Sequence, residues 1–162
     1  MIILGIDPGT TRIGYALLSK KDNDSIDLIN YGCLELKNKN QAERLVEISR
    51  LTSDLIAQYH PKLLAIEQLF FAKNVKTALS VAEARGVIIN AAASLNLEIL
   101  EFTPLQVKAA VTGYGKAEKR EVQKMVCRLL NLEKMPQPDD ANDAIAIGLT
   151  ACYTNPKLST KA

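Results

Sequence analysis

Residues 2–19 have the sequence IILGIDPGTTRIGYALLS, and the fold class of the chain follows from this segment. The apolar run at 2–6 predicts a buried strand, which the turn-forming sequence Asp7-Pro8-Gly9 ends. Residues 14–19 predict a second strand, and a polar turn separates them from a third strand at 26–36. Three early strands joined by short turns indicate an antiparallel meander.

Beyond residue 36 the hydrophobic pattern takes on the period of helices. Apolar residues at helical spacing predict a helix that ends at Pro61: Leu45, Ile48, Leu51, Leu55, Ile56 and Tyr59. Strands are predicted at 63–66 and 97–102. Helices are predicted at 77–95, from the Thr103-Pro104 cap onward, at 116–130 and at 139–153. Because strands that alternate with helices run parallel, this order predicts an α/β fold with a five-stranded mixed sheet flanked by helices.

The composition is that of a globular protein with one domain. The chain has 162 residues, of which 48% are hydrophobic and 23% charged, and its net charge is only +2. We expect a single domain over residues 1–155 and a short C-terminal tail at 156–162. No apolar run approaches the roughly 18 residues of a membrane span, and the apolar N-terminal run is too short for a signal peptide, so a cytoplasmic protein is expected.

Three cysteines and one histidine are predicted to have no catalytic or metal-binding role. Cys33, Cys127 and Cys152 lie far apart in the sequence and show no zinc-binding spacing. Free cysteines are commonly buried, so these are expected to be structural thiols. His60 precedes Pro61 at a predicted helix end, and a structural role is expected for it.

Four carboxylates occupy positions where such a fold could bring them together. Asp7 ends the first strand, Glu67 ends the fourth, and Asp140 and Asp143 lie in the first turn of the last helix. Strand ends are where α/β sheets build ligand sites. Because Asp140 and Asp143 are three residues apart, they lie on one side of the helix. Ala144 continues that side, so the pair should face the protein.

Carboxylates that face a protein interior need a positive partner, and no Lys or Arg lies nearby on that helix. Mg²⁺ or Mn²⁺ suits hard carboxylate oxygens, and two such ions roughly 3.5–4 Å apart can promote phosphodiester hydrolysis. Each acid also has an ordinary explanation. Asp7 could initiate a turn, Glu67 could be a plain strand-end acid, and Asp139, Asp140 or Asp143 could cap the last helix. The ordered set favours a nuclease.

The same segments resemble the signatures of RuvC-type Holliday junction resolvases. Ile6-Asp7-Pro8-Gly9-Thr10-Thr11-Arg12-Ile13-Gly14-Tyr15 resembles the opening strand and turn of that family. The other matching segments follow in the family's order: Ala65-Ile66-Glu67-Gln68 with Phe70 and Ala72-Lys73-Asn74, Glu83-Ala84-Arg85-Gly86, Gln106-Val107-Lys108, Ala117-Glu118-Lys119, and Asp140-Ala141-Asn142-Asp143-Ala144-Ile145-Ala146.

The resemblance implies an RNase H-like fold, a homodimer and paired, Mg²⁺-dependent incision of four-way DNA junctions. It implies that Asp7, Glu67, Asp140 and Asp143 are the metal-binding catalytic acids, with Asp140 preferred over its neighbour Asp139. It also suggests cooperation with the RuvA–RuvB branch-migration machinery.

Basic residues concentrate late in the chain, where they could bind DNA. Helical spacing would put Lys116, Arg120 and Lys124 on one stripe, which could also be an ordinary solvated helix face. By resemblance, Lys108 and Lys119 are the expected phosphate contacts near the scissile bond.

Two adjacent aromatic residues, Phe70 and Phe71, follow Glu67 closely. Phe70 is the candidate for stacking on a base at the junction centre, and Lys73 and Asn74 for holding the adjacent backbone. The alternative for either aromatic, and the one favoured for Phe71, is core packing.

The predicted helix at 77–95 is apolar or small on more than one side, which a helix with a single buried face does not require. Its small residues, Ala78, Ala82, Gly86 and Ala93, would permit close approach of a second helix. A two-fold homodimer would present two sites to a nearly two-fold junction. The alternative is a helix fully buried within one monomer.

Three other functions share features of this sequence with the resolvase. An actin-like phosphotransferase shares the Asp7-Pro8-Gly9-Thr10-Thr11 pattern but needs two such domains and a longer chain. Another RNase H-like nuclease, acting on RNA–DNA hybrids or ribosomal RNA precursors, would use the same acids. A non-catalytic junction-binding module would be expected to lack one of the acids.

Overall fold

A five-stranded mixed sheet forms the centre of the molecule in a computed structural model, which describes residues 1–37, 40–69 and 75–154. Its strands are β1 (Ile2–Asp7), β2 (Arg12–Lys20), β3 (Ile26–Glu35), β4 (Leu63–Glu67) and β5 (Glu98–Phe102), in the spatial order β3-β2-β1-β4-β5. The first three strands are antiparallel neighbours. β4 is parallel to β1, and β5 is parallel to β4. The predicted meander and parallel strands are both confirmed.

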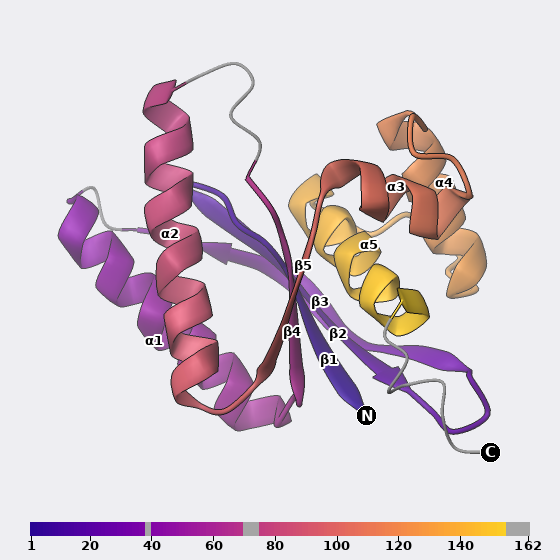
Figure 1. The fold of residues 1–162 in the computed structure, drawn as a ribbon, viewed down its shortest axis with the longest axis horizontal. Helices are drawn as coiled ribbons and strands as arrows, with labels where there is room; N and C mark the ends of the chain where they lie inside the picture. Colours follow the sequence, from indigo (N-terminus) through magenta and orange to yellow (C-terminus); the bar gives the residue numbers. More distant parts are fainter. Residues whose placement is uncertain (38–39, 70–74, 155–162) are drawn as a thin grey trace.

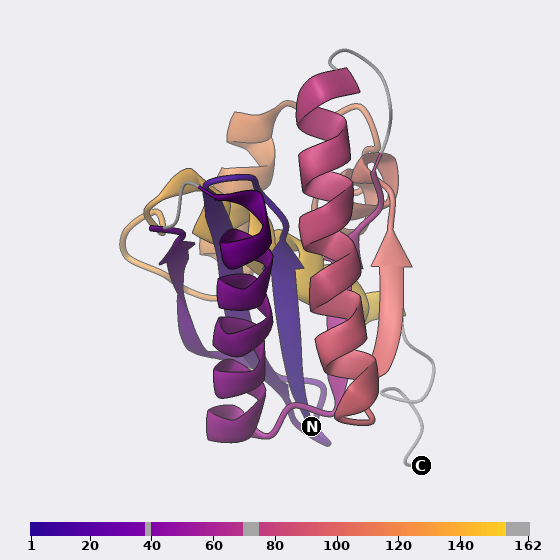
Figure 2. The same ribbon diagram turned by 90° about the vertical axis from the view of Figure 1, so that its left-hand side faces the viewer.

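Helices cover both faces of the sheet (Figures 1 and 2). On one face lie α1 (Gln41–Tyr59) and α2 (Val75–Ser94), and on the other lie α3 (Pro104–Thr112), α4 (Lys119–Leu129) and α5 (Asp139–Thr154). Thr103 caps α3 by accepting a hydrogen bond from the backbone N–H of Gln106, as its sequence predicted. His60 ends α1 in the left-handed conformation, which confirms its structural role.

The alternation of side chains along the strands divides the apolar core into two layers. Ile3, Leu18 and Leu63 belong to the core layer beneath α5. Leu4 and Ile66 belong to the layer beneath α1 and α2. Successive side chains of a strand point to opposite faces, so the continuous apolar runs of β1 and β4 contribute to both layers.

The central helix α5 lies directly on the β1–β2 hairpin because glycines face it. A Cβ atom on Gly14 would overlap the backbone carbonyl oxygen of Asp140, and one on Gly5 would overlap that of Ala144. Only glycine permits this approach of helix and strand backbones. The glycines therefore set the distance between α5 and the sheet, and this distance fixes the position of the acids in the first turn of α5.

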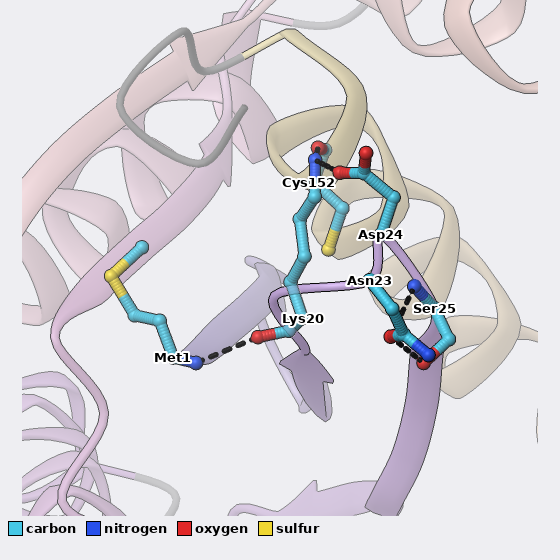
Figure 3. Close-up of polar contacts among 6 residues, drawn as sticks. All are labelled: Met1, Lys20, Asn23, Asp24, Ser25 and Cys152. Atoms are coloured by element: carbon cyan, nitrogen blue, oxygen red, sulfur yellow. Dashed lines mark hydrogen bonds and ion pairs between the residues drawn. The ribbon is translucent and has the colours of Figure 1, made fainter. Parts of the chain in front are cut away.

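Lys20 secures the opposite end of α5 (Figure 3). Its side chain is 6% exposed, and its Nζ donates a 2.7 Å hydrogen bond to the carbonyl of Cys152 while pairing with Asp24 at 3.2 Å. A cation at a helix C-terminus interacts favourably with the unpaired carbonyls there. In the adjoining turn, the backbone N–H and hydroxyl of Ser25 both donate to Asn23 Oδ1.

Two helix starts differ from the prediction. α2 begins at Val75, two residues early, and α4 begins at Lys119 instead of Lys116. α4 starts late because the backbone N–H of Glu118 donates to the Glu121 carboxylate, which completes one half of a capping box. Lys116 therefore lies before the helix, and the predicted helical stripe of Lys116, Arg120 and Lys124 is wrong.

The three cysteines are free thiols, with Cys152 buried and the other two half-buried. No helix in the described parts of the chain combines the length and the apolar character needed to cross a membrane.

Candidate active site

Asp7 and Glu67 end two neighbouring parallel strands, and the first turn of α5 crosses the same edge of the sheet. Asp7 ends β1 and pairs with Gly14 of β2. Gly14 in turn lies against the backbone of Asp140. Glu67 ends β4, whose pairing with β1 reaches Ile6. The sheet edge and the start of α5 thus bring the predicted acids toward one another.

The carboxylates at this edge of the sheet act on one another electrostatically. The pKa of Asp7 is raised to about 7, first by burial and then by the negative charges of Asp143, Glu67 and Asp140. Burial, followed by the charge of Asp143, also raises the pKa of Glu67. Of the adjacent pair Asp139 and Asp140, it is the charge of Asp140 that acts on Asp7, whereas Asp139 pairs with Lys119.

Lys119 supplies a cation that the sequence of α5 does not contain. Its Nζ lies 2.9 Å from Asp143 Oδ2 and 3.5 Å from Asp139 Oδ2. Asp139 also accepts a hydrogen bond from Gln123 Nε2 at 3.3 Å. The positive partner that α5 itself lacks therefore comes from α4, which packs against α5.

A cleft of about 290 Å³ opens beside these groups. It is lined by Glu67, Asp143, Lys108 and Lys119, with an apolar wall of Pro104, Val107, Val122, Ala146 and Ile147. Two acids and the two lysines expected near a scissile phosphate therefore share one cavity. The positive charge of Lys108 also acts on Glu67, where it lowers the pKa against the effect of burial.

The remaining predicted DNA contacts have different positions. Lys116 and Arg120 are exposed and lie outside the lining of this cleft. Phe70, Lys73 and Asn74, together with Phe71, fall outside the described residues.

Cys33 and Arg85 are site neighbours that no sequence argument placed there. Cys33 Sγ lies 4.0 Å from Asp140 Oδ2, and burial followed by the charge of Asp140 raises the pKa of this thiol. Its position follows from the strand register, because Cys33 pairs with Gly14. Arg85 Nε donates a 2.9 Å hydrogen bond to the backbone carbonyl of Glu67. In the sequence, Arg85 stands out only as part of the segment Glu83-Ala84-Arg85-Gly86.

The donor set fits a hard divalent cation. Its members are carboxylates, and burial followed by the charges of the other acids raises the pKa of Asp7 to about 7, a shift that a bound dication would oppose. In the described residues, no group of three acidic, histidine or cysteine side chains lies close enough together to hold an ion. The positive charge beside Asp143 is the ammonium group of Lys119.

Known proteins with related sequences span almost all of this chain. The family model described as crossover junction endodeoxyribonuclease RuvC matches residues 3–151. The RuvC protein of Halothermothrix orenii is 48% identical over 156 residues, which cover 96% of this chain and 93% of that protein. The RuvC protein of Petrotoga mobilis is 48% identical over 162 residues, covering 99% and 98%.

Solved structures show the same architecture. Thermus thermophilus RuvC matches with a TM-score of 0.88 and 29% identity, over 99% of each chain. The T. thermophilus RuvC in complex with a Holliday junction substrate matches with a TM-score of 0.86 and 26% identity, again over 99% of each chain. The fold is thus the RNase H-like α/β fold that the sequence predicted, and the chain belongs to the RuvC family of crossover junction endodeoxyribonucleases.

Proposed function

We propose that this chain is a structure-specific endodeoxyribonuclease that resolves four-way (Holliday) DNA junctions in recombination and repair, by paired, symmetric, Mg²⁺-dependent phosphodiester hydrolysis. One observation carries the proposal: the carboxylates Glu67 and Asp143 line one cleft with Lys108 and Lys119, on the fold of a RuvC protein solved with a Holliday junction substrate. A site for phosphodiester hydrolysis needs both metal-binding oxygens and cations for the phosphate.

Asp7, Glu67, Asp140 and Asp143 are the proposed metal-binding and catalytic acids. They would hold Mg²⁺, two ions per site, with Mn²⁺ as a substitute. When bound, such ions supply Lewis acidity for attack on the phosphodiester. Burial of Asp7 and Glu67 keeps the site partly free of water, which strengthens every charge interaction within it.

Lys108 and Lys119 are the proposed contacts to the scissile phosphate, because both line the cleft beside the acids. Lys119 is held in place by Asp143 and Asp139, so its ammonium group is already positioned before DNA binds. Lys116 and Arg120 are proposed to bind more distant phosphates, and Phe70, Lys73 and Asn74 to contact the junction centre.

A homodimer through α2 would present two such sites to one junction. Ala84, Ile88 and Ala92 of α2 are buried in the monomer core. On its other side Leu79 is 59% exposed, and nothing lies within 4 Å of a Cβ atom built on Gly86. Because α2 has one buried and one exposed side, it is not fully buried in one monomer, and the exposed side is available to bind a partner.

The proposed unit is a single nuclease domain over residues 1–155, followed by a tail at 156–162. We propose that it acts in the cytoplasm and that it works with the RuvA–RuvB branch-migration complex.

The test is cleavage of a labelled synthetic four-way junction with and without Mg²⁺, beside a linear duplex and an RNA–DNA hybrid, with Asp7→Asn as the inactive control. Symmetric cuts in the junction alone, lost without Mg²⁺ and in Asp7→Asn, are expected. Binding without cutting would instead indicate a junction-binding module, and cutting of the hybrid would indicate another RNase H-like nuclease.

A further inference from the structure

Glu67 directs its side chain toward one face of the sheet, while a residue on the opposite face binds its backbone. Leu63 and Ala65 of β4 contribute to the core layer beneath α5, and Leu64 and Ile66 to the layer beneath α1 and α2. By this alternation the Glu67 side chain points to the α5 face, where it lines the cleft. Its backbone carbonyl, in contrast, accepts a hydrogen bond from Arg85, which belongs to α2 on the opposite face.

The contact with Arg85 falls where strand pairing stops. The register between β4 and β1 ends at Ile6 and Ile66, one residue before Glu67. On the other side of β4, Glu67 still pairs with Phe102, and the N–H of Gln68 donates to the Phe102 carbonyl at 2.8 Å. A backbone carbonyl at a strand end needs a donor from outside the ladder, and the guanidinium group provides one.

The Arg85 side chain is itself held in place, so it can fix the position of the Glu67 carbonyl. Its side chain is 17% exposed, and its second nitrogen pairs with Glu101 of β5. Two residues earlier on α2, Glu83 accepts a hydrogen bond from Gln41 at the start of α1. The planar fork of a guanidinium can serve the Glu67 carbonyl and the Glu101 carboxylate together, whereas a lysine ammonium has no such fixed geometry.

We propose that Arg85 is a positioning residue, which fixes the peptide group of Glu67 and thereby directs the Glu67 carboxylate into the cleft. The inference rests on the proposed function only in taking the Glu67 carboxylate as a metal ligand of the active site. A site whose groups are displaced by about 1 Å can lose roughly 10²-fold in rate. The effect of removing Arg85 should therefore appear in metal binding and in the cleavage step, while junction binding, which depends on other residues, persists.

The experiment compares Arg85→Met and Arg85→Lys with the wild type. Arg50→Met is the matched control, because Arg50 is a well-exposed arginine whose ion pair is with Asp54 in its own helix. Three quantities are measured for each protein: Mn²⁺ affinity of the DNA-free protein by electron paramagnetic resonance, junction affinity in Ca²⁺, and the single-turnover cleavage rate at saturating protein.

In Arg85→Met we expect Mn²⁺ affinity to fall several-fold and the cleavage rate at least ten-fold, with junction affinity within two-fold of the wild type. Arg85→Lys should recover part of both losses, and Arg50→Met should match the wild type. Mn²⁺ affinity and cleavage rate within two-fold of the wild type in Arg85→Met would overturn the proposal. If Arg85→Met does not fold, the test passes to Arg85→Lys: Mn²⁺ affinity and cleavage rate within two-fold of the wild type in this variant would then overturn the proposal. A wild type that cuts no junction would refute the proposed function, while the Mn²⁺ measurement would still test Arg85.

Discussion

The carboxyl group of Asp7 holds its proton more tightly in the folded protein than in the unfolded chain. Its pKa rises from 3.8 to about 7 on folding, through burial and three neighbouring acids. The stability that this proton contributes is complete below about pH 4 and is lost as the pH rises through 7. The metal-free site is therefore a source of instability at neutral and alkaline pH.

Asp7→Asn should relieve this instability while abolishing cleavage. In EDTA, the Tm of the variant should exceed that of the wild type at pH 8, and the difference should shrink at pH 5, where Asp7 is protonated. Added Mg²⁺ should raise the Tm of the wild type at pH 8 more than that of the variant. Thermal denaturation at both pH values measures this, and a Tm difference independent of pH would contradict it.

Lys119 is predicted to matter for the cleavage step because its ammonium group lies in the cleft beside Asp143. Lys119→Met should lower the single-turnover cleavage rate by about 10²–10³-fold, the usual effect of removing one preorganised charge at a reacting centre. Lys116→Met is the control, since Lys116 is exposed and outside the cleft lining, and its rate should change only a few-fold. Equal losses in the two variants would show that Lys119 acts only through general DNA affinity.

At the scale of elements, the position of α5 depends on its backbone contact with β2. A methyl group at Gly14 would overlap the carbonyl of Asp140, and neither backbone can yield easily. Gly14→Ala should therefore lower the free energy of unfolding by at least about 1–3 kcal/mol, the usual range for overpacking, and should displace Asp140 and reduce cleavage.

Urea denaturation and junction cleavage measure both effects of Gly14→Ala. The matched control is Gly32→Ala in the neighbouring strand, where the atoms nearest to the added methyl belong to the Tyr15 side chain, at 3.0 Å. Because that ring can move, the control should lose little stability. A Gly14→Ala protein as stable and active as this control would refute the close-packing argument.

The other end of α5 depends on Lys20. Lys20→Met should reduce the free energy of unfolding by about 1–3 kcal/mol, because the buried Cys152 carbonyl loses a charged donor. Lys21→Met is the comparison, since the Lys21 side chain forms an exposed ion pair with Asp27, of the kind worth at most about 1 kcal/mol. Chemical denaturation of the two variants should therefore differ clearly, and similar values would mean that Lys20 contributes only as a surface charge.

For the whole molecule, the proposed dimer predicts that the exposed side of α2 controls the pattern of cleavage. Gly86→Glu places a charged side chain where a partner helix would lie, so the protein should sediment as a monomer and make single unpaired nicks. A charge change in the β2–β3 turn, Asp22→Lys, should leave a dimer that cuts in pairs. Sedimentation of Gly86→Glu as a dimer would place the subunit interface elsewhere.

The order of strands and helices could be predicted from the sequence because it depends on local periodicity. Apolar runs ending in turn residues indicated β1 and β4, and helical spacing indicated α1 and α5. The same patterns placed Asp7 and Glu67 at strand ends, where α/β folds build sites. The start of α4 was predicted wrongly, because the hydrogen bond from Glu118 to Glu121 outweighed the helical pattern that began at Lys116.

Contacts between elements could be known only from the tertiary structure. Lys119 and Asp143 are 24 residues apart, Arg85 and Glu67 are 18 apart, and Cys33 and Asp140 are 107 apart. No local pattern encodes such pairs, because they depend on how closely α5 approaches the hairpin and how α2 and α4 pack around it. The residue types of the site were therefore evident from the sequence, whereas the pairing of Lys119 with Asp143 and the support of Glu67 by Arg85 came from packing.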